Sequence, residues 1–170
     1  MIKIALTNLG KYNEGELVFE WLELPATDEQ IEECMNRIGI NEEYEEYFIS
    51  DYETDFDYEV SEYSSIKELN ELAESMENYS NDELEVFKAC MELGLSTEEA
   101  LDIVSIGDYV IWYNCNTMGD VAEAFLNETG ALSEVPENLL GYFDFDAYGR
   151  DMEFEGSFVE TDIGFVEIIR

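Results

Sequence analysis

The middle of the chain reads SIKELNELAESMENYSNDELEVFKACMELGLSTEEALDIVSIG (residues 65–107). Three times in this stretch a serine stands three residues before a glutamate: Ser65 and Glu68, Ser80 and Glu83, Ser96 and Glu99. This spacing is typical of a capping box, in which the two side chains satisfy free backbone N–H groups at the start of a helix. Apolar residues recur at helical spacing behind each pair, and Gly94 stands where the second helix should end. The stretch therefore predicts a helical module over residues 63–105.

The residues before this module predict antiparallel strands and one helix. Strands are expected at residues 2–6, 17–22 and 47–52, where apolar residues alternate or β-formers gather. The first two form a hairpin with a long, turn-rich connection at residues 9–15. Thr27 and Gln30 give a further capping-box pattern, and Gly39 ends the helix that follows. Residues 1–62 therefore form a first module.

The last third of the chain again mixes strands and helices. Strands are expected at residues 109–113, 158–159 and 165–168. A helix with its apolar face at residues 121–126 ends at Gly130, and a short mixed region covers residues 139–154. The expected fold class is α+β, elongated, with three small modules in a row: a mixed sheet plus helix (residues 1–62), a helical middle module (residues 63–105), and a mixed sheet plus helices (residues 106–170).

Acidic residues dominate the whole chain. It carries 43 acidic and 7 basic residues, for a formal net charge of −36. The net charges of residues 1–60, 61–105 and 106–170 are −14, −10 and −12, so the charge is not confined to a tail. Because 46% of the residues are hydrophobic, we expect a folded protein with a heavily charged surface rather than a disordered chain.

This charge load is comparable to that of DNA. Duplex DNA carries one charge per roughly 1.7 Å of axis, so 36 charges correspond to about 60 Å of duplex. A compact globule of this length would be only about 40 Å across, and self-repulsion favours a more elongated arrangement. Nucleic acids and anionic membranes are not expected partners, because both attract basic proteins. Halophilic proteins are also acidic throughout, but large aromatic and aliphatic residues are not depleted here.

Cysteine usage and the N-terminus bear on the compartment. Cys34, Cys90 and Cys115 are odd in number and far apart, so we expect packing residues rather than disulfides or a zinc site. Met1 leads directly into the first strand without a signal segment, and no apolar run reaches membrane-spanning length. These features favour a cytoplasmic location.

Motifs for catalysis are missing from the sequence. The chain contains no histidine, which excludes Ser-His-Asp and Cys-His catalysis and most zinc sites. It also contains no phosphate-cradling GxGxxG or Walker-type loop. Paired carboxylates for glycoside hydrolysis stay open, but 43 acids make any one pair uninformative. We do not expect an enzyme, and no cofactor or metal ion is expected.

One stretch resembles a calcium-binding loop in outline. In residues 144–155, Asp144, Asp146, Gly149 and Glu155 fall at EF-hand positions. Tyr148, however, occupies a position that needs a short oxygen ligand. A calcium-binding acidic protein is therefore kept as an alternative function.

The aromatic run Tyr109–Tyr113 has two interpretations. Because it is apolar on both faces, it favours a buried central strand. The other interpretation is a contact with a partner, because Tyr and Trp are enriched at interface cores.

Four strings resemble one known family, the ArdA antirestriction proteins of mobile genetic elements. The strings are LGKYNEGEL (residues 9–17), YEEYFISDYE (44–53), IKELN (66–70) and LGYFDFDAYGRD (140–151). The similarity runs essentially end to end, and residues 140–151 match the family's antirestriction stretch. The resemblance implies elongated, three-module α+β homodimers that imitate bent duplex DNA. Such proteins bind type I restriction-modification enzymes in place of DNA and inhibit them stoichiometrically.

The resemblance and the charge together predict a partner-binding surface that replaces DNA in the groove of the methyltransferase core. The carboxylates expected on it are Glu14, Glu16, Glu42, Glu43, Glu45, Glu46, Asp51, Glu53, Asp55, Asp57, Glu71, Glu74, Glu77, Asp144, Asp146 and Asp151. The homodimer is expected to form through the last module, with Tyr109, Val110, Ile111, Trp112 and Tyr113 as a candidate contact. An acidic decoy or chaperone for another basic DNA-binding protein is a further alternative.

Overall fold

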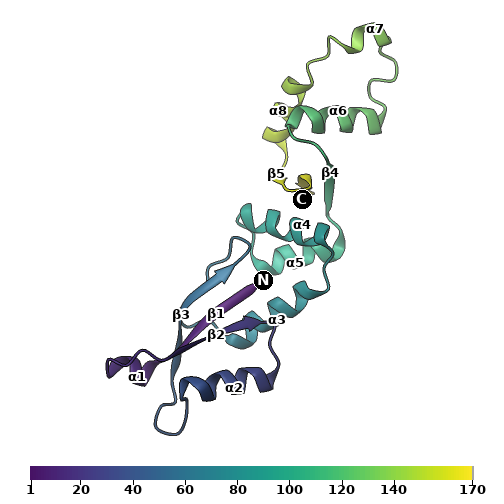
Figure 1. Ribbon diagram of the computed structural model, residues 1–170. Coiled ribbons are helices and arrows are strands. Elements are labelled where there is room, and N and C mark those ends of the chain that lie inside the picture. The colour runs from purple at the N-terminus through teal and green to yellow at the C-terminus, as the bar shows by residue number, and fades with distance from the viewer. Residues whose placement is uncertain (170) are drawn as a thin grey trace. The chain divides into compact units, whose positions relative to one another are not determined.

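A computed structural model describes residues 1–169 (Figure 1). Within these residues the chain forms eight helices and two three-stranded antiparallel sheets, which confirms the α+β class. The fold divides into two compact units, Met1–Tyr79 and Ser80–Arg170. The division into three modules stays a prediction, and Arg170, the last residue of its third module, lies outside the described residues.

The first unit is built on a sheet with the strand order β2-β1-β3. The elements of this unit are β1 (Ile2–Asn8), α1 (Leu9–Asn13), β2 (Phe19–Leu24), α2 (Asp28–Ile38), β3 (Tyr47–Thr54) and α3 (Ile66–Glu77). Strand β1 takes the central place because both of its faces are suited to burial: Ile4, Ala5 and Leu6 are all buried. It pairs antiparallel with both neighbours, so the predicted hairpin and third strand are confirmed.

The connection between β1 and β2 differs from the predicted turn. It forms the short helix α1, which is capped by the side chain of Asn8: the backbone N–H of Lys11 donates to Asn8 Oδ1 at 3.0 Å. The amide Nδ2 of Asn8 donates to the carbonyls of Ile38 and Gly39 at 3.1 and 3.2 Å, which ties α1 to the end of α2. The second strand begins later than predicted, since Leu17 precedes β2 and is 65% exposed.

The second unit contains a sheet with the strand order β4-β6-β5. Its elements are α4 (Asn81–Glu92), α5 (Thr97–Ile106), β4 (Tyr109–Tyr113), α6 (Met118–Thr129), α7 (Glu137–Leu140), α8 (Phe145–Glu155), β5 (Phe158–Thr161) and β6 (Gly164–Ile168). The interpretation of Tyr109–Tyr113 as a buried central strand is wrong, because β6 lies between β4 and β5 and leaves β4 at an edge. Of its five side chains only that of Trp112 is buried.

Side-chain caps start most of the helices, as the sequence predicts. Complete capping boxes form at Thr27 and Gln30, at Ser80 and Glu83, and at Ser96 and Glu99. At α3 only half of the predicted box is present, where Ser65 Oγ accepts from the backbone N–H of Glu68 at 3.4 Å. A box that the sequence analysis did not identify, Thr117 with Asp120, starts α6. Helix starts are local features, which explains why they are predictable.

Apolar side chains form the interior of each unit, and the cysteines belong to it. Cys34, Cys90 and Cys115 are all buried, which confirms their prediction as packing residues. In the second unit Cys115 shares a cluster with Trp112, Met118, Val121 and Phe165. None of the helices within residues 1–169 is long and apolar enough to cross a membrane.

Helices α6 and α8 approach each other through glycines. Gly149 on α8 is buried, and a Cβ atom there would overlap the backbone carbonyl of Met118 at the start of α6. A Cβ atom at Gly119 would overlap the carboxylate of Asp146. The close contact therefore depends on the absence of a side chain at Gly149, which faces backbone, whereas the flexible carboxylate of Asp146 can move away from one at Gly119.

The substitution Gly149→Ala is predicted to destabilise the protein by about 1–3 kcal/mol, because the added methyl forces the two helices apart. Urea unfolding followed by circular dichroism measures this change. The matched control is Gly141→Ala in the same stretch, where an added Cβ meets no atom within 4 Å. If Gly149→Ala is as stable as Gly141→Ala, the glycine contact does not hold the helices together.

Candidate partner-binding surface

All sixteen carboxylates predicted for the partner-binding surface lie on exposed residues. They come from the turn after α1 and the loop before β3, from β3 and the turn after it, from α3, and from the start and middle of α8. Thirteen therefore belong to the first unit and three to the second.

The largest group is the α1 cluster, which unites two acidic segments that lie far apart in the sequence. Its members are Glu14, Glu16, Glu42, Glu43, Glu45 and Glu46. The ring of Tyr44 packs so closely on Gly10 that a Cβ atom there would overlap it. The Tyr44 hydroxyl donates to Glu14 Oε2 at 3.1 Å, and the Leu9 backbone N–H donates to the carbonyl of Glu46 at 3.0 Å. The side chain of Tyr44 and the Leu9–Glu46 backbone hydrogen bond therefore hold the two segments together.

The carboxylates of the α1 cluster affect the pKa of Tyr44. The hydrogen bond to Glu14 raises the pKa of the Tyr44 phenol, and the negative charges of Glu14, Glu43 and Glu16 raise it further. All three carboxylates are negatively charged, so they disfavour ionisation of the phenol to the phenolate. The cluster therefore gathers negative charge around the half-buried side chain of Tyr44.

A β-bulge directs the carboxylates of β3. Leu6 pairs with Ile49 and Ala5 pairs with Asp51, which leaves Ser50 as the extra residue. Because of this shift, Ile49 shares a face with Leu6 and is buried, whereas Asp51 is on the other face and is exposed. The bulge therefore allows an apolar and an acidic residue two positions apart to point to opposite faces.

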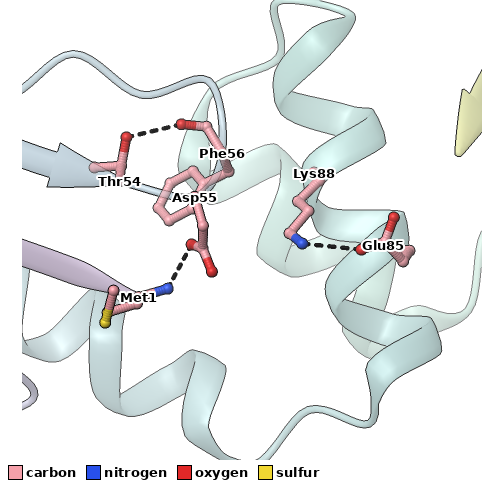
Figure 2. A network of polar contacts seen from close by, with 6 residues as sticks. All are labelled: Met1, Thr54, Asp55, Phe56, Glu85 and Lys88. Carbon is pink, nitrogen blue, oxygen red and sulfur yellow. Dashed lines mark hydrogen bonds and ion pairs between the residues drawn. The ribbon is translucent and has the colours of Figure 1, made fainter. Parts of the chain in front are cut away.

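Further along β3, carboxylates meet positive groups of the same unit. Lys3 Nζ lies 3.7 Å from Glu53 Oε2 and 5.1 Å from the centre of the Trp21 ring. The N-terminal ammonium of Met1 forms an ion pair with Asp55 just after β3 (Figure 2). Asp57 follows in the same turn and is exposed.

Helix α3 carries Glu71, Glu74 and Glu77 on its exposed side. Glu71 Oε1 lies 3.6 Å from Lys67 Nζ, and Glu74 Oε1 accepts from Asn70 Nδ2 at 2.9 Å. Glu71 and Glu74 also line a groove between α2 and α3. The sequence analysis did not identify this groove.

The acidic residues of α8 do not form a calcium-binding loop. Asp144 is the N-cap of α8, and its Oδ1 accepts from the backbone N–H of Ala147 at 2.9 Å. Residues 145–155 are helical, so they cannot wrap around an ion as an EF-hand loop does. The calcium-binding alternative based on Asp144, Asp146 and Glu155 is therefore wrong. Asp151 is exposed on the middle of the helix.

Several of the seven basic residues contact acidic or aromatic groups of the same chain. Arg37 donates to Glu20 at 2.9 Å and to Glu33 at 3.0 Å. Lys88 lies 2.9 Å from Glu85 (Figure 2), and Lys11 lies over the Tyr44 ring at 5.9 Å. With four bases against 22 acids in Met1–Tyr79 and three against 21 in Ser80–Arg170, each unit has a net charge of −18. The surface of each unit is therefore negative.

The candidate dimer contact, β4, is exposed only in part. The Trp112 side chain belongs to the core of the second unit, and its Nε1 donates to Glu167 at 3.0 Å. Tyr113 is 53% exposed, and its hydroxyl donates to Asp82 Oδ2 at 2.6 Å. That hydrogen bond raises the pKa of the Tyr113 phenol. Tyr109, Val110 and Ile111 are half-buried.

The fold and the surface define an α+β protein whose two units are both strongly acidic. The chain belongs to the ArdA family, since the family model described as antirestriction protein (ArdA) matches residues 4–167. Membership implies antirestriction activity and an interaction with restriction enzymes, and members of the family act as inhibitor proteins. A search of curated proteins finds no match to the chain.

The sequence analysis missed Tyr44 as the residue that organises the α1 cluster. The available signal is an aromatic residue in the middle of four glutamates, at positions 42–46. An isolated aromatic side chain in such a segment needs an apolar contact or a polar partner. Gly10 and Glu14 supply these in the fold.

The substitution Glu14→Gln is predicted to lower the pKa of Tyr44 towards the ordinary tyrosine value. It removes one negative charge and replaces a charge-assisted hydrogen bond with a neutral one. Carbon-13 NMR of tyrosine labelled at Cζ, the ring carbon that carries the hydroxyl, measures the pKa of Tyr44 directly. The control is Glu77→Gln on α3 of the same unit, which is not among the carboxylates that raise the pKa of Tyr44 and should leave it unchanged. An unchanged value in Glu14→Gln contradicts the contact between the two segments.

Proposed function

We propose that this protein is a DNA mimic that occupies the DNA-binding groove of the methyltransferase core of a type I restriction-modification enzyme. One observation carries the proposal: both units present a negative surface, on which all sixteen predicted carboxylates are exposed. Family membership supplies the antirestriction role. Inhibition is then stoichiometric, because each inhibitor occupies one binding site on the enzyme and does not turn over.

The physical basis is the match between carboxylates and phosphates. A DNA-binding groove is lined with lysine and arginine side chains, and carboxylates form charge-assisted hydrogen bonds with the same groups. The net charge of −18 on each unit corresponds to about 30 Å of duplex DNA at one charge per roughly 1.7 Å. Long-range attraction makes association fast and sensitive to salt.

The protein is predicted to displace DNA from the methyltransferase core of a type I enzyme at near-stoichiometric ratios. Titration into the core bound to fluorescent duplex, at two salt concentrations, measures this by fluorescence anisotropy. Displacement should be weaker at high salt, because exposed charges are screened within about 10 Å at 0.1 M ionic strength.

Failure to displace DNA at low salt contradicts the proposal. A pull-down from cell lysate then tests the alternative of an acidic decoy for another basic DNA-binding protein. The control competitor is polyglutamate of 36 residues, which carries a net charge of −36 without the folded surface.

The protein is also proposed to form a homodimer through β4. The Asn114 N–H donates to the Ile163 carbonyl at 3.1 Å, and the Ile169 N–H donates to the Asp108 carbonyl at 3.0 Å. In an antiparallel pair, backbone groups point alternately towards and away from the partner strand. Those of Tyr109, Ile111 and Tyr113 therefore point away from β6. They are suited to pair with β4 of a second copy, which continues the sheet.

Ile111→Pro is predicted to give a monomer, whereas the wild-type protein is a dimer at micromolar concentration. Proline removes an outward N–H group without removing a bond to β6, so the edge strand tolerates it. Light scattering coupled to size exclusion measures the mass. The matched control is Glu160→Pro on β5, the opposite edge of the same sheet, which should stay dimeric. A monomeric wild-type protein overturns the proposal.

A further inference from the structure

A groove of about 460 Å³ lies between α2 and α3 in the first unit. Both helices also contact β2, and Figure 1 shows where the three elements lie in the first unit. On α2 the groove is lined by Asp28, Ile31 and Met35, which share one face at helical spacing. Tyr47 of β3 and Ile66 of α3 add to the lining.

Several apolar side chains that line the groove are not fully buried by the packing of the unit itself. Helix α2 buries Cys34 and Ile38 completely, whereas Ile31 and Met35 stay half-buried. Tyr47 is 37% exposed. Apolar side chains left accessible in a concave surface are typical of a binding groove for a protein segment.

The rim of the groove is acidic and partly pre-arranged. It contains Asp28, Glu71 and Glu74, against one base, Lys67, which is paired with Glu71 at 3.6 Å. Asn70 positions Glu74: its Oδ1 accepts from the backbone N–H of Ala26 at 2.7 Å, while its Nδ2 donates to Glu74 at 2.9 Å. The carboxylate of Glu74 is therefore held in place beside the groove.

We propose that this groove binds a segment of the partner enzyme that carries a lysine or arginine beside an apolar side chain. The acidic rim complements the basic group, and the apolar lining complements its neighbour. A second copy of this chain is not the preferred occupant, because it has only 7 basic residues to offer to the acidic rim. The proposal rests on the proposed function, to which it adds a contact that DNA phosphates do not make.

The two kinds of contact differ in their dependence on salt. Contacts between carboxylates and basic groups weaken as salt rises, whereas burial of apolar surface does not depend on counterions. A change in the groove lining should therefore alter affinity equally at low and high salt. A change in the exposed carboxylates should alter the salt dependence itself.

The test is DNA displacement from the type I methyltransferase core by Met35→Gln, a change of similar volume that removes the apolar end of the side chain. Affinity should fall about tenfold at every salt concentration, with the slope of affinity against salt unchanged. The control is Leu93→Gln at the end of α4, another partly exposed apolar residue (37%), which should compete like the wild type. Equal competition by Met35→Gln and Leu93→Gln overturns the proposal.

A second measurement covers the possibility that Met35→Gln unfolds. A photoreactive diazirine analogue of leucine in place of Met35 keeps the apolar volume and should crosslink to the methyltransferase core. Mass spectrometry should locate the crosslink beside a lysine or arginine, and the same analogue in place of Leu93 should give none. A crosslink to a second copy of this chain, or none, contradicts the proposal. If the wild-type protein does not displace DNA at all, the proposed function fails, and not the groove alone.

Discussion

Mutual repulsion among 43 carboxylates is the constraint on which the rest of the structure depends. Like charges in a compact protein oppose folding, and here they are shared equally between two units of −18 each. The opposing contributions are the buried apolar side chains of each unit and a set of local contacts that use carboxylates favourably. Glu83 and Asp120 cap helix starts, and these hydrogen bonds lower the pKa of both groups. Because a lowered pKa favours the folded state above the unfolded pKa, this contribution is lost as the pH falls through the folded pKa.

Local contacts also stabilise the acidic surface of the protein. Acidic residues at the first turns of α2 and α5 lie near the positive ends of the helix dipoles, so they stabilise these helices while staying exposed. The bulge in β3 separates Ile49 from Asp51, so that one strand supplies both the core and the surface. Tyr44 brings six carboxylates of two segments together through its contacts with Gly10 and Glu14. In each case an aromatic, apolar or backbone group supplies the local stability that the charges themselves oppose.

Local features of this fold were predictable from the sequence, and long-range ones were not. The starts of α2, α4 and α5 follow from short capping patterns, and the strands of both sheets follow from apolar alternation or from runs of β-forming residues. The edge position of β4 depends on β6, which arrives some fifty residues later in the chain, so the apolar run alone suggested a central strand. Residues 144–155 matched the spacing of a calcium loop, but Asp144 caps a helix instead. The exposure of the sixteen carboxylates was predictable from their charge. The contact of Glu14 with residues 42–46 and the groove between α2 and α3 were not predictable, because they form only in the tertiary structure.

The central claim is that the binding energy is spread over many carboxylates, as it is along a DNA duplex. The most direct test is the affinity of the type I methyltransferase core for sixteen single variants, each with one predicted carboxylate changed to its amide. The account predicts that every variant folds and that none weakens binding by more than about tenfold, since exposed charge pairs contribute roughly 0.2–1 kcal/mol each. A single variant that abolishes binding while its circular dichroism spectrum stays unchanged would contradict the account, because it would place the energy in one site.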